Sequence, residues 1–232
     1  MITTIAFDAD DTLWQNETFF RLTEQRFLAM LADYAEHDGL SERLRAAEVR
    51  NLSAYGFGIK GFTLSMIETA LEITEHRVPG TVIAEILAAG RELLTHPVET
   101  LPYVDQVLSQ VQQRYRLILI TKGDLFDQER KLAASGLAEY FSAVEIVSDK
   151  TEAVYRRIFT TRADGSERTL MVGNSLKSDI LPALAAGSFA IHVPHDLTWS
   201  FEHAEAPLDE PRFAHIAHLG ELPEAIEKFM AL

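Results

Sequence analysis

The feature of this sequence that most constrains its fold is a set of short apolar segments, each followed closely by polar residues. Their length and β-branched content are typical of buried strands in a parallel sheet. Helical segments lie between the later ones: apolar residues from Val104 to Val111 repeat at one-face spacing, and the segment around Asp127 to Ser135 stops at Gly136. This alternation predicts an α/β fold with a Rossmann-like, three-layer core around a parallel sheet. The expected strands are Ile2–Phe7, Arg116–Thr121, Ala143–Val147, Thr169–Val172 and Phe189–Val193.

The stretch from Trp14 to Thr95 breaks this alternation, because it holds several helical segments and no convincing strand. Pro79-Gly80 interrupts the stretch, and Thr81 is expected to cap the helix that follows. We predict an α-helical cap subdomain over residues 15–95, inserted into an α/β core formed by residues 1–14 and 96–232. One apolar helix face of this insert, expected to pack in its core, carries Phe27, Met30, Leu31 and Tyr34.

The charge balance of the chain excludes a broad nucleic-acid surface. Lys and Arg total 21 against 35 Asp and Glu, which gives a net charge of -14, so an anionic substrate must be held by local groups or by a metal. No apolar stretch is long enough to span a bilayer, and Asp8, Asp10 and Asp11 interrupt the first apolar run too early for a signal peptide. The absence of cysteine excludes disulfides and thiolate chemistry and fits a reducing compartment, so we expect a cytoplasmic protein.

Two aspartates follow the first expected strand. Asp8 ends this strand and Asp10 lies two residues on, so both side chains can address one substrate from the same face of an extended chain. One carboxylate can attack phosphorus, while the other protonates the leaving alcohol and then deprotonates the water that opens the aspartyl-phosphate. These roles require different proton affinities. We expect a bound cation to keep Asp8 ionised and the neighbouring negative charge to favour a proton on Asp10.

The segment Asp8-Ala9-Asp10-Asp11-Thr12 resembles motif I, DxDxT, of the haloacid dehalogenase-like superfamily. Two further segments resemble later motifs of this family, in the family's order and at the ends of expected strands. Thr121, before Lys122 and Gly123, resembles the motif II residue whose hydroxyl and following amide hold the phosphate. Lys150 resembles the motif III lysine that neutralises the nucleophile and the phosphoryl oxygens.

The segment MVGNSLKSDI resembles motif IV, where the family usually places two acidic groups around magnesium. It departs from the motif at one position, because Asn174 stands where a carboxylate is usual. An amide oxygen still ligates a hard cation, and magnesium commonly needs only one or two protein carboxylates. The resemblance implies a weakened Mg2+ site formed by Asp8, the backbone carbonyl of Asp10, Asn174 and Asp179.

The resemblance implies a phosphohydrolase that cleaves a small-molecule phosphate monoester through an aspartyl-phosphate. Its nucleophile is Asp8, its acid and base is Asp10, and the phosphate is held by Thr121 and Lys150. Lys122, beside motif II, could add positive charge for the phosphate, with a solvated lysine as the alternative. The dehalogenases of the superfamily lack the carboxylate two residues after the nucleophile, so Asp10 favours phosphoryl chemistry. Two alternatives stay open: a phosphate- or partner-binding protein with weak or no turnover, which Asn174 favours, and a phosphomutase. The motifs specify neither the metabolite nor the oligomeric state.

Other polar residues near the motifs are expected to have ordinary roles. Asp11 is expected to be solvated or to cap a helix, and His192 and His195 to be polar residues after the last main strand. Lys60 lies in a glycine-rich stretch, Ala54 to Phe62, that could close on the substrate and meet an anionic leaving group. A loop between two helices is the alternative for this stretch.

Overall fold

The structure, a computed structural model, describes residues 1–34, 36–197 and 199–230 and divides the chain into two compact units. The α/β unit consists of Met1–Glu17, Val98–Lys122 and Gln128–Leu232. The helical unit consists of Thr18–Pro97 together with Gly123–Asp127. Residues 123–127, which the sequence places in the expected core, therefore group with the helices.

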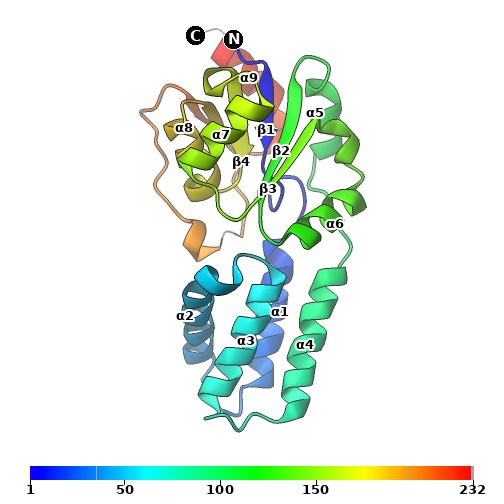
Figure 1. Ribbon diagram of the computed structural model, residues 1–232, viewed down its shortest axis with the longest axis vertical. Coiled ribbons are helices and arrows are strands. Elements are labelled where there is room, and N and C mark those ends of the chain that lie inside the picture. The colour runs from blue at the N-terminus through cyan, green and yellow to red at the C-terminus, as the bar shows by residue number, and fades with distance from the viewer. Residues whose placement is uncertain (35, 198, 231–232) are drawn as a thin grey trace. The chain divides into compact units, whose positions relative to one another are not determined.

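In the part of the chain that the structure describes, six parallel strands form one sheet in the order β3-β2-β1-β4-β5-β6 (Figure 1). All five strands expected from the sequence are present, which confirms the α/β prediction. The edge strand β6 was not expected, because three residues are too few to show an alternating pattern. The strands are β1 Thr4–Phe7, β2 Arg116–Lys122, β3 Ala143–Val147, β4 Thr169–Gly173, β5 Phe189–His192 and β6 Phe213–His215.

Successive residues of β1 point to opposite faces of the sheet and pack into different cores. Ile5 and Phe7 pack with apolar residues of α5 and α9 on one face, whereas Ala6 packs with residues of α7 and α8 on the other. The sheet therefore lies between two helical layers. The helices of this unit are α5 Val104–Val111, α6 Leu125–Ser135 from Gln128 on, α7 Glu152–Arg162, α8 Leu181–Ala185 and α9 Leu222–Met230. Short helical turns are η1 Ala138–Tyr140, η2 Ser166–Arg168, η3 Leu176–Ile180, η4 Ser200–Glu202 and η5 Leu219–Glu221.

The helical unit contains α1 Glu17–Met30, α2 His37–Tyr55, α3 Ile59–Ile73 and α4 Gly80–Thr95, packed around an apolar core of its own. Phe27 and Leu31 are buried in this core, but Tyr34 is exposed because α1 ends before it. The expected cap at Thr81 is wrong. Helix α4 begins at Gly80 with Pro79 as its N-cap residue, so Thr81 already lies inside the first turn.

Most of the glycine-rich stretch from Ala54 to Phe62 is helical. Helix α2 continues to Tyr55 and α3 begins at Ile59, which leaves only residues 56–58 between them. Gly56 and Gly58 adopt φ angles of 71° and 116°, a region that side chains with a Cβ rarely enter. A loop between two helices is therefore present but limited to residues 56–58, and closure of this stretch on a substrate stays a prediction.

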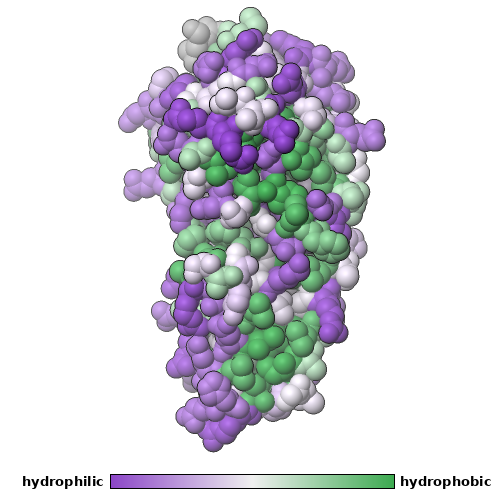
Figure 2. Space-filling model, in the orientation of Figure 1, coloured by the Kyte–Doolittle hydropathy of each residue, from purple (hydrophilic) through white to green (hydrophobic). Residues whose placement is uncertain are grey.

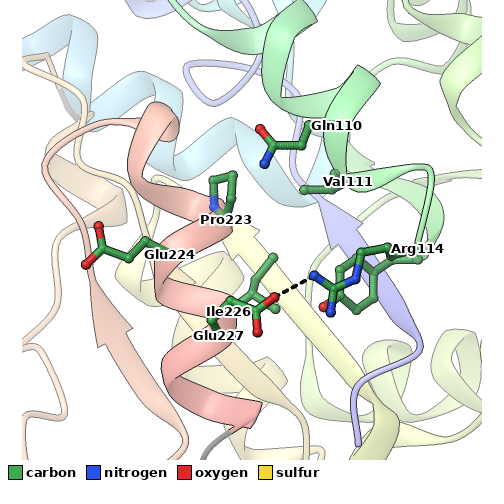
Figure 3. Close-up of a pocket in the computed structure, with 8 residues that line it drawn as sticks. Gln110, Val111, Arg114, Pro223, Glu224, Ile226 and Glu227 are labelled. Carbon is green, nitrogen blue, oxygen red and sulfur yellow. Dashed lines mark hydrogen bonds and ion pairs between the residues drawn. The ribbon is translucent and has the colours of Figure 1, made fainter.

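None of the helices in the described ranges is long and apolar enough to cross a membrane. Hydrophobic residues show on the visible face of the helical unit over α3 and α4, where Leu64 and Leu87 are partly exposed (Figure 2). A cavity of about 250 Å³ lies between α5 and α9 (Figure 3). It is lined by Gln110, Val111, Arg114, Tyr115, Pro223, Glu224, Ile226 and Glu227, none of which belongs to the motifs.

Candidate active site

The order of the strands identifies where a ligand is expected to bind. The chain runs from β1 to β2 and β3 on one side, then crosses to β4, β5 and β6 on the other, so the switch point lies between β1 and β4. Open α/β sheets bind ligands outside the carboxyl ends of the strands at this point. Asp8 follows β1 directly, and its backbone amide donates to the carbonyl of Val172 in β4 at 2.9 Å.

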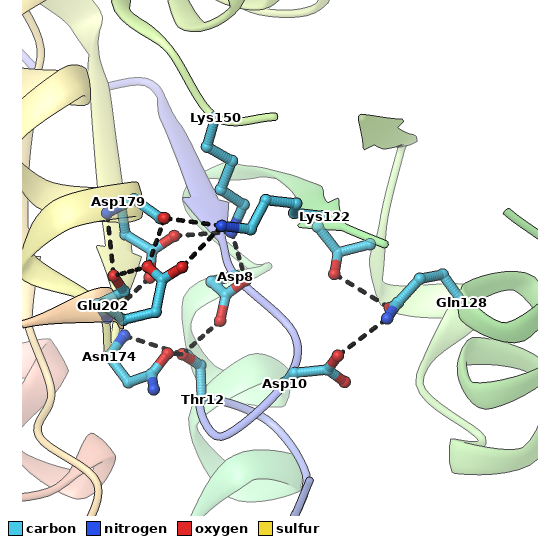
Figure 4. Close-up of polar contacts among 12 residues, drawn as sticks. Asp8, Asp10, Thr12, Lys122, Gln128, Lys150, Asn174, Asp179 and Glu202 are labelled. Atoms are coloured by element: carbon cyan, nitrogen blue, oxygen red, sulfur yellow. Dashed lines mark hydrogen bonds and ion pairs between the residues drawn. The ribbon is translucent and has the colours of Figure 1, made fainter. Parts of the chain in front are cut away.

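Lys150 joins the two carboxylates on either side of this switch point (Figure 4). Its ammonium donates to Asp8 Oδ1 and, at 2.6 Å, to Asp179 Oδ1. All three side chains are buried. Lys150 is positioned by the start of α7, where the Thr151 side chain caps the helix by accepting from Val154 N. The structure thus brings together one residue from each of three sequence motifs.

One ammonium does not fully neutralise this carboxylate pair. Burial and the charge of Asp179 raise the pKa of Asp8 to about 7, although Lys150 opposes the shift. Burial alone would lower the pKa of Lys150, but Asp179 and Asp8 raise it well above its usual range, so this side chain stays charged. The site therefore favours an additional positive charge next to Asp8.

The loop after β4 is tied to the loop after β1 by Thr12. The Thr12 hydroxyl lies 2.9 Å from Asp8 Oδ2 and accepts from the backbone amide of Asn174 at 3.1 Å. It also lies 3.3 Å from Asn174 Oδ1, so Thr12 is within reach of both Asp8 and the Asn174 amide oxygen. His192 bonds the Asn174 carbonyl at 2.9 Å, which holds the same loop from β5.

Asp179 is held by the residues just before it. The Ser175 backbone amide donates to Asp179 Oδ2 at 2.9 Å, and the Ser175 side chain accepts from Ser178 N at the start of η3. Gly173 leaves room for this arrangement, because a Cβ there would lie 2.3 Å from Asp179 Oδ2. Gly173 was not anticipated from the sequence, although a glycine in a strand often marks a close approach of other atoms to the backbone.

Asp10 is held differently from the sequence prediction. Its Oδ1 accepts from Trp14 Nε1 and Lys131 Nζ, both at 2.7 Å, and its Oδ2 accepts from Gln128 Nε2 and Lys131 Nζ, both at 2.9 Å. Burial alone would raise the pKa of Asp10, but Lys131 and these hydrogen bonds lower it. The expected preference for a proton on Asp10 is therefore wrong for this structure, because Lys131 outweighs the neighbouring Asp8.

The two predicted phosphate ligands on β2 are engaged with other side chains. The Thr121 hydroxyl donates to Gln128 Oε1 at 3.0 Å, and Gln128 in turn donates to Asp10. Lys122 Nζ donates to Glu202 Oε1 at 2.7 Å and to Ser178 Oγ at 3.0 Å. Gln128, Lys131 and Glu202 were not anticipated. Only the first two had a sequence signal, since they lie three residues apart on the helix that follows motif II.

Three residues for which the sequence predicts ordinary roles, or an alternative one, form specific contacts in the structure. Asp11 caps α1, because its carboxylate accepts from the backbone amides of Asn16 and Glu17, but it is buried instead of solvated. His195 Nε2 lies 3.1 Å from Gln15 Oε1. Lys60, in the helical unit, forms an ion pair with Asp124 at 3.0 Å.

The donor set of the site fits a hard divalent cation. The side chains of Asp8, Asp179 and Asn174 offer oxygen ligands, and magnesium combines one or two carboxylates with water and phosphate oxygens. The raised pKa of Asp8 is consistent with this, because a cation beside the two carboxylates would lower it. Over the described residues, no cluster of three or more His, Cys, Asp or Glu side chains is arranged to hold a metal. A third side-chain ligand for the cation, beside Asp8 and Asp179, would therefore have to be the amide oxygen of Asn174.

Comparisons with known proteins agree with this geometry. A family model described as haloacid dehalogenase-like hydrolase matches residues 2–187. The glyceraldehyde 3-phosphate phosphatase of Methanothermobacter thermautotrophicus is 30% identical over 210 residues, which are 85% of this chain and 88% of the relative. A haloacid dehalogenase-like family hydrolase from Xanthomonas campestris is 39% identical, with a TM-score of 0.87 over 98% of this chain and 91% of that one.

A more distant structure shares the fold. The HAD-hydrolase-like protein YfnB of Bacillus subtilis, solved bound to magnesium, is 19% identical, with a TM-score of 0.69 over 97% of this chain and 99% of that one. The motif residues gathered at the switch point and the match of the family model over most of the chain lead to one conclusion. This chain belongs to the haloacid dehalogenase-like hydrolase family.

Proposed function

We propose that this chain is a magnesium-dependent phosphatase that hydrolyses small-molecule phosphate monoesters through an aspartyl-phosphate on Asp8. The observation that carries the proposal is the placement of Asp8 at the switch point, in contact with the Lys150 ammonium and facing Asp179. A relative named as a phosphatase of glyceraldehyde 3-phosphate supports a small phosphorylated substrate. We further propose that the helical unit, predicted over residues 15–95, acts as a cap that selects the substrate.

The proposed reaction has two steps. In the first, an Asp8 carboxylate oxygen bonds to phosphorus, the bond from phosphorus to the ester oxygen breaks, and the alcohol leaves with a proton from Asp10. In the second, water bonds to phosphorus, the bond to Asp8 breaks, and Asp10 takes a proton from that water. Lys150 offsets the charge on Asp8 and on the phosphoryl oxygens throughout. The first step requires Asp10 to take up a proton from solvent when the substrate binds, because Lys131 keeps it ionised beforehand. The same contact suits Asp10 to the second step, in which it starts ionised.

Magnesium belongs to this proposal because the family generally uses it and a structural relative was solved with it. Bound between Asp8, Asp179, Asn174 and the Asp10 carbonyl, it would supply positive charge for the phosphoryl oxygens. Asn174→Asp adds a negative charge to this set, so we expect half-maximal activity at a severalfold lower magnesium concentration. An unchanged midpoint in a magnesium titration would remove Asn174 from the ligand set.

The test of the function is turnover of para-nitrophenyl phosphate with and without magnesium. We expect phosphate release that requires magnesium, and loss of at least about 1,000-fold in Asp8→Asn, because an amide cannot serve as the attacking group. Trapping of labelled phosphate on Asp8 in the parent would identify the intermediate. Equal rates in the parent and in Asp8→Asn would overturn the covalent mechanism.

Two other outcomes identify the alternative functions. The Asn174 amide is the observation that favours a binding protein with weak turnover, and saturable phosphate binding without release would support it. Transfer of label between two sugar phosphates, in place of free phosphate release, would identify a phosphomutase.

A further inference from the structure

A carboxylate from a distant part of the chain reaches the loop that carries Asp179. Glu202, in η4, forms an ion pair with Lys122 at 2.7 Å and accepts from Ser175 Oγ at 2.5 Å (Figure 4). The Ser178 hydroxyl also donates to Glu202 Oε2. The side chains of Lys122 and Glu202 are only 12% and 13% exposed, so this pair is largely withdrawn from solvent. Water therefore screens it less than it screens a surface ion pair.

The segment that carries Glu202 is fastened to the same loop. Lys177 Nζ lies 3.5 Å from the centre of the Phe201 ring and donates to the Phe201 carbonyl at 2.9 Å. The Glu202 backbone amide donates to the Trp199 carbonyl at 2.8 Å. These contacts hold the backbone on both sides of Phe201, so the position of the Glu202 carboxylate is set by the fold as well as by its own ion pair.

The pairing of Glu202 completes a pattern among the lysines at this edge of the sheet. Lys150 is bound by Asp8 and Asp179, and Lys131 is bound by Asp10. Glu202 binds Lys122 in the same way. Each of these three ammonium groups thus faces at least one carboxylate of the protein before a substrate arrives. If a substrate carried a second anionic group, that group would have to compete with a carboxylate of the protein for each of these ammonium groups.

We propose that Glu202 is a specificity-determining residue that selects phosphate monoesters whose organic part is uncharged near the phosphate. This inference rests on the proposed phosphatase function and names its substrate class. A carboxylate on the substrate beside Lys122 meets the charge of Glu202, and the repulsion lowers its turnover relative to a neutral analogue. The phosphate itself would be held by Thr121, Lys150 and a bound cation, while Lys122 stays paired with Glu202, so Glu202 discriminates without preventing phosphate binding.

The test compares two substrates that differ at one carbon, glycerol 3-phosphate and 3-phosphoglycerate, in which a CH2OH group is replaced by a carboxylate. We expect the parent to have the higher kcat/KM for glycerol 3-phosphate. In Glu202→Gln, which removes the charge and keeps the size, we expect this ratio to fall by about tenfold, the range of one partly screened charge interaction. The change should come from faster turnover of 3-phosphoglycerate, because Lys122 is released.

Two variants control for effects that do not depend on this charge. Glu202→Asp keeps the carboxylate and should keep the parent preference, and Glu205→Gln removes an exposed charge three residues further on and should also keep it. A Glu202→Gln protein with the parent ratio would overturn the proposal. If this variant does not fold, the parent alone decides, since equal or faster hydrolysis of 3-phosphoglycerate contradicts the inference. Failure of the parent to hydrolyse para-nitrophenyl phosphate would instead contradict the proposed function.

Discussion

At the scale of single residues, Gly173 carries the strictest steric requirement of the site. A Cβ at this position would lie 2.3 Å from Asp179 Oδ2 and 2.6 Å from Asp179 Cβ, so the neighbour must move as a whole. We expect Gly173→Ala to displace Asp179 and to lower kcat by about 100-fold, as a small misplacement of a positioning group does. The measurement is kcat for magnesium-dependent hydrolysis of para-nitrophenyl phosphate. The melting temperature of the same variant shows whether it remains folded.

Gly136→Ala is the matched control for this substitution. Gly136 has a φ of 73° with no atom within 4 Å of an added Cβ, so alanine there strains only the backbone. We expect it to cost about 1 kcal/mol of stability and to leave kcat unchanged. Gly173→Ala with full activity would show that Asp179 tolerates displacement and has no positioning role.

At the scale of elements, α6 connects strand β2 to Asp10. Thr121 at the end of β2 donates to Gln128, and Gln128 and Lys131, one turn apart on α6, both donate to Asp10. Lys131 also donates to Asn16 Oδ1 at 3.0 Å, so it bridges two parts of the loop after β1. The helix therefore sets both the orientation and the charge of Asp10.

We expect Lys131→Met to slow the second step, in which Asp10 acts as a base, and to lower kcat by about tenfold near neutral pH, within the range that acid–base catalysis contributes. Because Lys131 lowers the pKa of Asp10, its removal should move the acidic limb of the pH–rate profile to higher pH. A base is active only above its pKa. If the pKa of Asp10 is raised, activity is lost at a higher pH when the pH is lowered. Kinetics over a pH series, on aryl phosphates with different leaving groups, measures both effects.

A double mutant separates this role from simple loss of packing. If Lys131 acts through Asp10, then Lys131→Met combined with Asp10→Asn should be no slower than Asp10→Asn alone. Lys228→Met removes an exposed ammonium from α9 and should leave the profile in place. Additive losses in the double mutant would mean that Lys131 contributes independently of Asp10.

At the scale of the whole molecule, the buried Asp8 makes stability depend on pH. Its pKa is raised to about 7 from 3.8, so between these values the folded chain holds a proton that the unfolded chain has released. The contribution of Asp8 to the free energy of unfolding is therefore fully present at low pH and is lost as the pH rises from about 4 to about 7. A cation bound beside Asp8 would offset the loss.

We expect Asp8→Asn to melt higher than the parent at pH 8 in chelator, by about 5 °C, since on the order of 2 kcal/mol shifts a chain of this size by that much. At pH 5 the difference should be small, because Asp8 is then mostly protonated. Added magnesium should raise the melting temperature of the parent at pH 8 more than that of the mutant. A parent that is the more stable of the two at pH 8 in chelator would contradict the raised pKa.

The sequence by itself was enough to predict the α/β class, five of the strands and the residues that follow them. These features are local: an apolar run marks each strand, and the motif residues lie at the strand ends or within a few residues of them, so their meeting at one edge follows from parallel pairing. Asp8, Lys150 and Asp179 come together in this way. The extent and role of a cap over residues 15–95 stay predictions.

Only the tertiary structure decided how these groups are charged and held. Lys131 contacts Asp10 across 121 positions of the chain, and Glu202 contacts Lys122 across 80. No periodicity or spacing in the sequence encodes such pairs, because they depend on how helices and loops pack against the sheet. The proton expected on Asp10 was assigned wrongly for the same reason: its pKa depends on a lysine that packing brings to it, and charge interactions act through space and not along the chain.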